Sequence, residues 1–200
     1  SLITRATGSN AGLADVLETY SIFGRQAISN SAGPASQELS RILIQFPITN
    51  ISADRTAGRG PASGSVSFYL RMFNAPHSKT VPRDYKLVVQ PISQSWQEGE
   101  GLDLEGYKDF TKGNPGSNWV SASNTAAWTN VGGDYLTGSA SLMYEQSFNV
   151  GIENLEVNIT PLVESWIAGT TPNYGVGVRL SSSFEAFFSS SSGANTGSII

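Results

Sequence analysis

The chain has 200 residues, 39% of them hydrophobic and 10% aromatic, which is enough to bury one substantial core, so we expect a single domain over residues 1–200. Twelve Lys and Arg against sixteen Asp and Glu give a net charge of -4 without a basic stripe, which argues against a nucleic-acid partner. The absence of cysteine and the single histidine, His77, exclude disulfides, thiolate metal sites and a histidine zinc cluster. No apolar run approaches the roughly 20 residues that cross a bilayer, so we expect no membrane insertion.

Alternation of apolar and polar residues with period two recurs along the chain and predicts β-strands. The alternating stretches are, in chain order, residues 41–49, 65–73, 85–90, 144–150, 155–159 and 174–180. Each stretch has one polar face, which is typical of antiparallel sheets that pack on one another. The connections are rich in Gly, Asn, Ser and Pro and are longer than tight hairpin turns. We therefore predict an all-β, jelly-roll-like antiparallel sandwich.

One short helical turn is predicted near Thr160–Ala168. Thr160 suits the N-cap, Pro161 suits the first helical position, and Gly169 suits the left-handed residue that ends the turn. The apolar residues that share one face of this turn are Leu162, Val163 and Trp166. We expect the helix to close one end of the sandwich with the Trp166 ring buried beneath it.

The sequence contains no set of residues that indicates catalysis. There is no G-x-S-x-G turn, and His77 lies in a Pro-flanked loop, so a Ser-His-acid triad is not predicted. Carboxylates gather in residues 98–109, but their spacing does not match an EF-hand loop. We interpret this acidic stretch as a solvated loop, with an ion-binding loop as the alternative. The prediction is no catalytic residue, no cofactor and no metal ligand.

Three tryptophans, Trp96, Trp119 and Trp128, lie in or beside loops and have two interpretations. Large rings often pin long loops onto a sandwich, because they bury much apolar area and carry one N–H that needs a partner. Exposed rings can instead stack on sugars, so the same three residues are candidate glycan contacts.

Residues 95–103, 117–135 and 147–180 resemble, in order and spacing, the DNRLRE-type β-sandwich domain of extracellular bacterial and archaeal proteins. Residues 8–24 and 40–48 are similar to that family's first two strands. The matching positions are Trp96, Glu98, Gly99, Trp119, Trp128, Gly132, Gly133, Asp134, Thr160, Leu162, Val163, Trp166, Asn173 and Gly175. The resemblance implies a jelly-roll-like, non-catalytic module. The amino-acid sequence of this chain is also similar to versions of the domain carried on marine tailed-phage virions. We therefore expect an extracellular or virion location.

The family usually ends in a further strand, and the Ser-rich end of this chain has no counterpart to it. An open sheet edge would result, and such an edge is a template for a strand from another chain. We expect residues 1–10 to be an extended arm whose Leu2, Ile3 and Thr4, with high β-propensity, are donated to a neighbour. Residues 189–200 are expected to be a Ser-rich tail or the start of further chain.

These observations together predict a non-enzymatic structural subunit of an extracellular or virion assembly, such as a fibre, filament or decoration. Its partners would be copies of itself or other assembly subunits. The alternative is a carbohydrate-binding module that holds a polysaccharide with the three loop tryptophans.

Overall fold

A computed structural model describes residues 10–25, 35–76, 80–101, 116–138 and 142–185. The strands are β1 Tyr20–Arg25, β2 Ala35–Ser40, β3 Ile42–Ile44, β4 Tyr69–Met72, β5 Tyr85–Pro91, β6 Tyr144–Phe148, β7 Leu155–Asn158 and β8 Val176–Leu180. Two short helices, α1 Thr49–Thr56 and α2 Thr160–Ile167, complete the secondary structure of this part of the chain. The predicted all-β class is confirmed, and the jelly-roll order of crossings stays a prediction.

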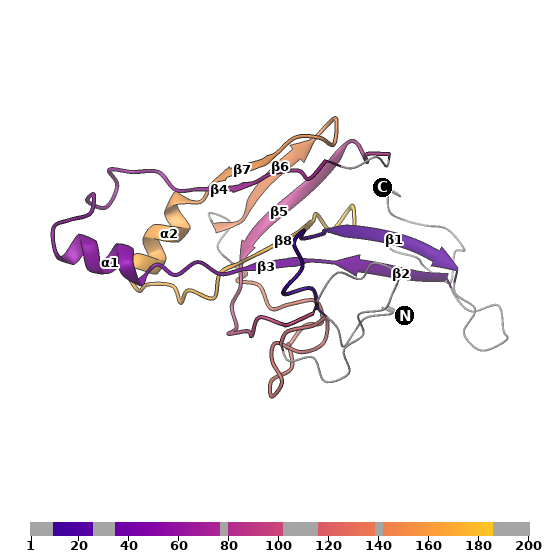
Figure 1. Ribbon diagram of the computed structural model, residues 1–200, viewed down its shortest axis with the longest axis horizontal. Coiled ribbons are helices and arrows are strands. Elements are labelled where there is room, and N and C mark those ends of the chain that lie inside the picture. The colour runs from indigo at the N-terminus through magenta and orange to yellow at the C-terminus, as the bar shows by residue number, and fades with distance from the viewer. Residues whose placement is uncertain (1–9, 26–34, 77–79, 102–115, 139–141, 186–200) are drawn as a thin grey trace.

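The described strands form sheets of unequal width (Figure 1). The widest has four antiparallel strands in the order β3-β8-β5-β6, and a two-stranded sheet pairs β4 with β7. A separate antiparallel hairpin joins β1 to β2. The chain is therefore sandwich-like, but one of its two main layers is only half as wide as the other.

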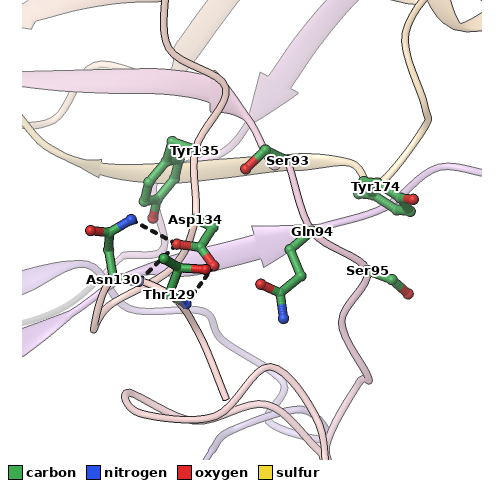
Figure 2. Close-up of a pocket in the computed structure, with 8 residues that line it drawn as sticks. All are labelled: Ser93, Gln94, Ser95, Thr129, Asn130, Asp134, Tyr135 and Tyr174. Atoms are coloured by element: carbon green, nitrogen blue, oxygen red, sulfur yellow. Dashed lines mark hydrogen bonds between the residues drawn. The ribbon is translucent and has the colours of Figure 1, made fainter. Parts of the chain in front are cut away.

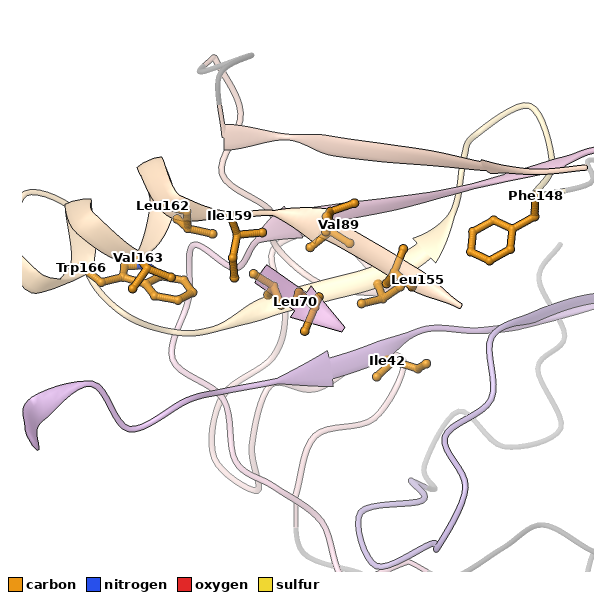
Figure 3. Close-up of a cluster of buried hydrophobic side chains, with 12 residues drawn as sticks. Ile42, Leu70, Val89, Phe148, Leu155, Ile159, Leu162, Val163 and Trp166 are labelled. Atoms are coloured by element: carbon orange, nitrogen blue, oxygen red, sulfur yellow. The ribbon is translucent and has the colours of Figure 1, made fainter. Parts of the chain in front are cut away.

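The main core lies between the four-stranded sheet and the layer that β4, β7 and α2 form (Figure 3). It contains Ile42 from β3, Leu70 from β4, Val89 from β5, Phe148 from β6, Leu155 and Val157 from β7, Val176 and Val178 from β8, and Ile159, Leu162, Val163 and Trp166 around α2. Every one of these residues is at most 7% exposed. Removal of this apolar area from water is the main stabilising contribution to the fold.

Part of the opposite face of the four-stranded sheet is covered by residues 92–101 and 116–136, which we call the loop layer. Ile92, Ala122 and Trp128 form a second buried cluster there, and Leu43 packs against it from β3. At Gly177 of β8 a Cβ atom would lie 2.5 Å from a ring carbon of Tyr135, so glycine is needed for the ring to approach the sheet. Strands β5 and β8 are consequently buried on both faces.

Two of the predicted strands differ from the structure in extent or exposure. The stretch 41–49 forms a strand only as far as Ile44, and Phe46 is 39% exposed, because Asn173 bonds the Phe46 carbonyl and the chain turns into α1. The prediction of one polar face per strand is wrong for β5, since the loop layer covers its second face.

Helix α2 confirms the predicted helical turn, with Leu162, Val163 and Trp166 buried and Gly169 left-handed at φ 71°. The predicted N-cap is wrong, because Ile159 occupies that position and Thr160 is already helical. The Thr160 hydroxyl instead accepts a hydrogen bond of 2.8 Å from the Phe68 backbone N–H. It thereby joins the start of α2 to β4 rather than capping its own helix.

Helix α1 was not predicted, because its sequence resembles a turn-rich connection and the helix buries no residue. A bidentate ion pair holds it to α2, with Arg55 nitrogens 2.7 and 2.8 Å from the two Glu164 carboxylate oxygens. Ser63 donates a further bond of 2.8 Å to the same carboxylate. The bonds from Arg55 are the main reason that the pKa of Glu164 is lowered to about 2.

We expect acid to weaken the fold through Glu164. Because folding lowers its pKa from 4.5 to about 2, its stabilising contribution is complete above about pH 4.5 and is lost as the pH falls through about 2. Glu164→Gln should be less stable at neutral pH and should lose less stability on acidification, as measured by thermal unfolding between pH 6 and 2. Glu145→Gln, which removes the exposed pair with Lys86, is the control and should retain the acid dependence of the unchanged protein. Equal acid dependence in Glu164→Gln and the unchanged protein would contradict this.

Candidate functional site

The three loop tryptophans all lie in the loop layer, and their rings face the protein. Trp128 is 6% exposed and donates its indole N–H to the Asn118 carbonyl at 2.9 Å. Trp96 is half-buried and donates to the Tyr174 carbonyl at 2.8 Å. The Trp96 bond joins two separate loops and the Trp128 bond closes one loop on itself, which favours the loop-anchoring interpretation over a sugar platform.

Trp119, also half-buried, packs against the Arg41 side chain. The Arg41 guanidinium carbon lies 4.9 Å from the Trp119 ring centroid and 5.7 Å from that of Tyr135. The same guanidinium donates to both Glu185 carboxylate oxygens, at 2.8 and 2.6 Å, and to the Gly132 carbonyl at 2.8 Å. Burial acts to lower the pKa of Arg41, but the bond to Glu185 and the nearby charges outweigh it and raise that pKa. Arg41 therefore links β3, the loop layer and the end of the described chain.

Asp134 organises the turn between residues 128 and 135 (Figure 2). Its carboxylate accepts hydrogen bonds from the backbone N–H groups of Thr129 and Asn130, at 2.7 and 2.8 Å, and from the Asn130 side chain at 2.9 Å. Burial acts to raise the pKa of Asp134, but these bonds outweigh it and lower that pKa. With its oxygens engaged by three donors, Asp134 is suited to hold the turn rather than to transfer protons.

An open polar hollow of about 510 Å³ lies beside this turn (Figure 2). The residues that line it are Ser93, Gln94, Ser95, Thr129, Asn130, Asp134, Tyr135 and Tyr174. These residues supply hydroxyls, amides and one carboxylate, that of Asp134, which already accepts three hydrogen bonds. There is no histidine among them. The hollow can hold water or a small polar group, but it has no nucleophile next to a general base.

A second hollow is an apolar groove of about 300 Å³ between the two main layers. Its floor includes Ile42 and Val178 of the wide sheet, and its opposite wall includes Met72 of β4. At its rim Phe73 is 80% exposed and Leu17 is 44% exposed. Large apolar side chains this exposed around a groove are typical of a surface that contacts another macromolecule.

The two edges of the narrow sheet differ. On the β7 side, the Gln146 side chain of β6 accepts from the Glu156 backbone N–H at 2.7 Å and donates to the Asn154 carbonyl at 2.8 Å. This amide closes the gap between the edges of β6 and β7. Among the described residues, no strand pairs with the other edge of β4. In the described part of the chain, the gap beside β7 is therefore bridged to β6, whereas the outer edge of β4 has no paired strand.

Several sequence-based predictions fall outside the described residues. They are the donor residues Leu2, Ile3 and Thr4, the Ser-rich segment 189–200, His77, and most of the acidic stretch 98–109. Glu98 and Glu100 of that stretch are described and exposed. Within the described ranges, no group of three or more His, Cys, Asp or Glu side chains could hold a metal ion. No described helix is long and apolar enough to cross a membrane.

Sequence reasoning missed the role of Arg41 and the open edge of β4. Arg41 and Glu185 are 144 residues apart, and neither belongs to a recognisable motif. Asp134 was named only as a position that matches the family pattern, and its role in organising the turn was not predicted. Comparisons with protein-family models, curated proteins and solved structures found no match to the chain.

Proposed function

We propose that this protein is a non-enzymatic structural subunit of an extracellular or virion assembly, in which the open side of the sandwich packs against a neighbouring subunit. The observation that carries the proposal is the unequal width of the two main layers: among the described residues, no strand pairs with the outer edge of β4, and an apolar groove lies beside that edge. An exposed strand edge presents a row of N–H and C=O groups without protein partners, which is a ready template for a strand of another chain. The resemblance to a DNRLRE-type module is consistent with such a role and stays a prediction.

The saccharide alternative draws less support from the geometry. Sugar stacking needs an exposed ring face, whereas Trp128 is buried and the indole N–H groups of Trp96 and Trp128 are bonded to backbone carbonyls. Enzymatic function likewise lacks a reactive set, because neither hollow brings a nucleophile and a base together.

We expect the purified protein to form a regular oligomer or polymer in a concentration-dependent way. Sedimentation velocity and negative-stain electron microscopy measure this directly. If Leu2, Ile3 and Thr4 are donated to a neighbour, deletion of residues 1–8 should abolish the assembly and leave a folded but less stable monomer. If the protein of residues 1–200 stays monomeric at its highest soluble concentration, the proposed function is contradicted. A truncated protein that assembles as before would contradict only donation from this end.

A further inference from the structure

The free edge of β4 presents backbone groups from alternate residues. Hydrogen bonding alternates along an antiparallel strand, so each residue either bonds its neighbour or points away from it. The Phe68 carbonyl accepts from the Ile159 N–H across the narrow sheet, and in the observed register Leu70 and Met72 also face β7. The N–H and C=O groups of Tyr69, Arg71 and Phe73 consequently point to the open side.

The side chains of these same residues lie on the outer face of the narrow sheet. Tyr69 is 49% exposed and Phe73 is 80% exposed, while the intervening Leu70 is 4% exposed. An edge strand with two exposed aromatic residues and free backbone groups favours pairing with another strand.

Charge does not block this edge, although Arg71 lies at its centre. Its guanidinium is 2.9 Å from a Glu156 carboxylate oxygen and 5.8 Å from the Tyr69 ring centroid. Two copies facing each other here would bring together two arginines and two glutamates, a set with no net charge. The proposed register sets the two arginines opposite each other, and the Glu156 carboxylate that pairs with each of them offsets this repulsion.

The strand order also indicates where an added strand would lie. Because Gln146 joins β6 to β7, the narrow sheet lies on the β6 side of the wide sheet, and towards β3 it ends at the outer edge of β4, across the groove from residues 17–21. The apolar groove reaches Ile42 of β3 from the β4 side. A strand beside β4 would extend the narrow sheet along this groove.

We propose that β4 pairs in antiparallel fashion with β4 of a second copy about a two-fold axis at Arg71, so that two narrow sheets become one four-stranded sheet. This inference rests on the proposed function and names its contact. With Arg71 opposite Arg71 of the second copy, Tyr69 faces Phe73 in both directions, and every outward backbone group of the three residues gains a partner. The contact is isologous, as expected for the commonest class of homodimer.

Engineered cysteines test this register, because the chain has no cysteine of its own. Arg71→Cys should form an intermolecular disulfide under mild oxidation, since residues paired across a two-fold axis bring their Cα atoms to about 5.5 Å. Ser147→Cys, an exposed position on edge strand β6, is the matched control and should remain largely uncoupled.

A charged side chain placed at the edge of β4 tests the same contact without a covalent cross-link. Phe73→Lys should weaken self-association by about tenfold or more in sedimentation equilibrium, because it removes an aromatic contact from each half of the pair. Ile152→Lys, at a position 66% exposed and outside β4, should associate like the unchanged protein. Circular dichroism and the midpoint of thermal unfolding should show that both lysine variants are folded.

The outcomes separate this inference from the proposed function. An assembly that forms equally well with Phe73→Lys, and in which Arg71→Cys couples no better than Ser147→Cys, would overturn β4 pairing and leave the structural role standing. If deletion of residues 1–8 abolishes the assembly, while Phe73→Lys assembles normally and Arg71→Cys does not couple, β4 pairing is overturned in favour of strand donation. A strictly monomeric protein would overturn both.

Discussion

Trp166→Ala is expected to lower the free energy of unfolding by about 3–5 kcal/mol, the usual cost of emptying a large aromatic site in a core. The Trp166 ring is 4% exposed and closes the end of the main core beneath α2, together with Leu162, which is fully buried. Its removal leaves a cavity between a short helix and two sheets, which a helix of eight residues cannot fill by a small shift. Urea unfolding, with the midpoint and slope compared to the unchanged protein, measures the loss.

Trp166→Phe is the matched control. The Trp166 indole N–H is buried and has no hydrogen-bond partner among the described residues, so its loss removes no bond. Phenylalanine retains most of the ring volume, and its cost should be well below that of alanine. A loss of less than about 1 kcal/mol for Trp166→Ala would mean that α2 does not close the core.

Arg41→Met is expected to cost about 3 kcal/mol, the second-largest effect among these variants. Arg41 and Glu185 are 16% and 13% exposed, and removal of one partner leaves the other carboxylate in a poorly hydrated position without its two bonds. The change also removes the cation that lies over Trp119 and the donor to the Gly132 carbonyl. Urea unfolding gives the total loss.

Two comparisons identify the cause of that loss. Arg59→Ala removes an exposed ion pair with Asp54, whose partners are 69% and 52% exposed, and should cost at most about 1 kcal/mol. Adding Glu185→Leu to Arg41→Met should recover part of the stability, because the unpaired carboxylate is then gone. If the double variant is as unstable as the sum of the single ones, the two residues do not act as a pair.

Much of the strand content is readable from local pattern. The alternating stretches 65–73, 85–90, 144–150, 155–159 and 174–180 each contain an observed strand, because a half-buried strand must place apolar residues at every second position. The weaker elements carry no such signal. Helix α1 buries no residue, and the hairpin of β1 and β2 was indicated only in part by the family resemblance. The secondary structure of a segment without an apolar face depends on its tertiary contacts more than on its own sequence.

The candidate contact surface was only partly predictable. The resemblance led to an expected open edge at a missing last strand, and that prediction concerns residues outside the described ranges. Among the described residues, the edge without a paired strand is that of β4. The loop tryptophans were identified from the sequence, whereas the direction of their rings depends on carbonyls such as that of Tyr174, which is 78 residues from Trp96. Ring orientation of this kind follows from the packing of distant loops.

The all-β class, most strand positions and the helical turn that buries Trp166 could be read from the sequence, because they follow from periodicity, proline and glycine within a few residues. Three features appear only in the folded chain: the loop layer packs on the second face of the wide sheet, Arg41 meets Glu185, and no described strand pairs with the outer edge of β4. Each of these features depends on which distant segments come together. Short-range patterns in a single sequence do not indicate such pairings. These long-range contacts stabilise the fold only after the distant segments have been brought together, which costs chain entropy.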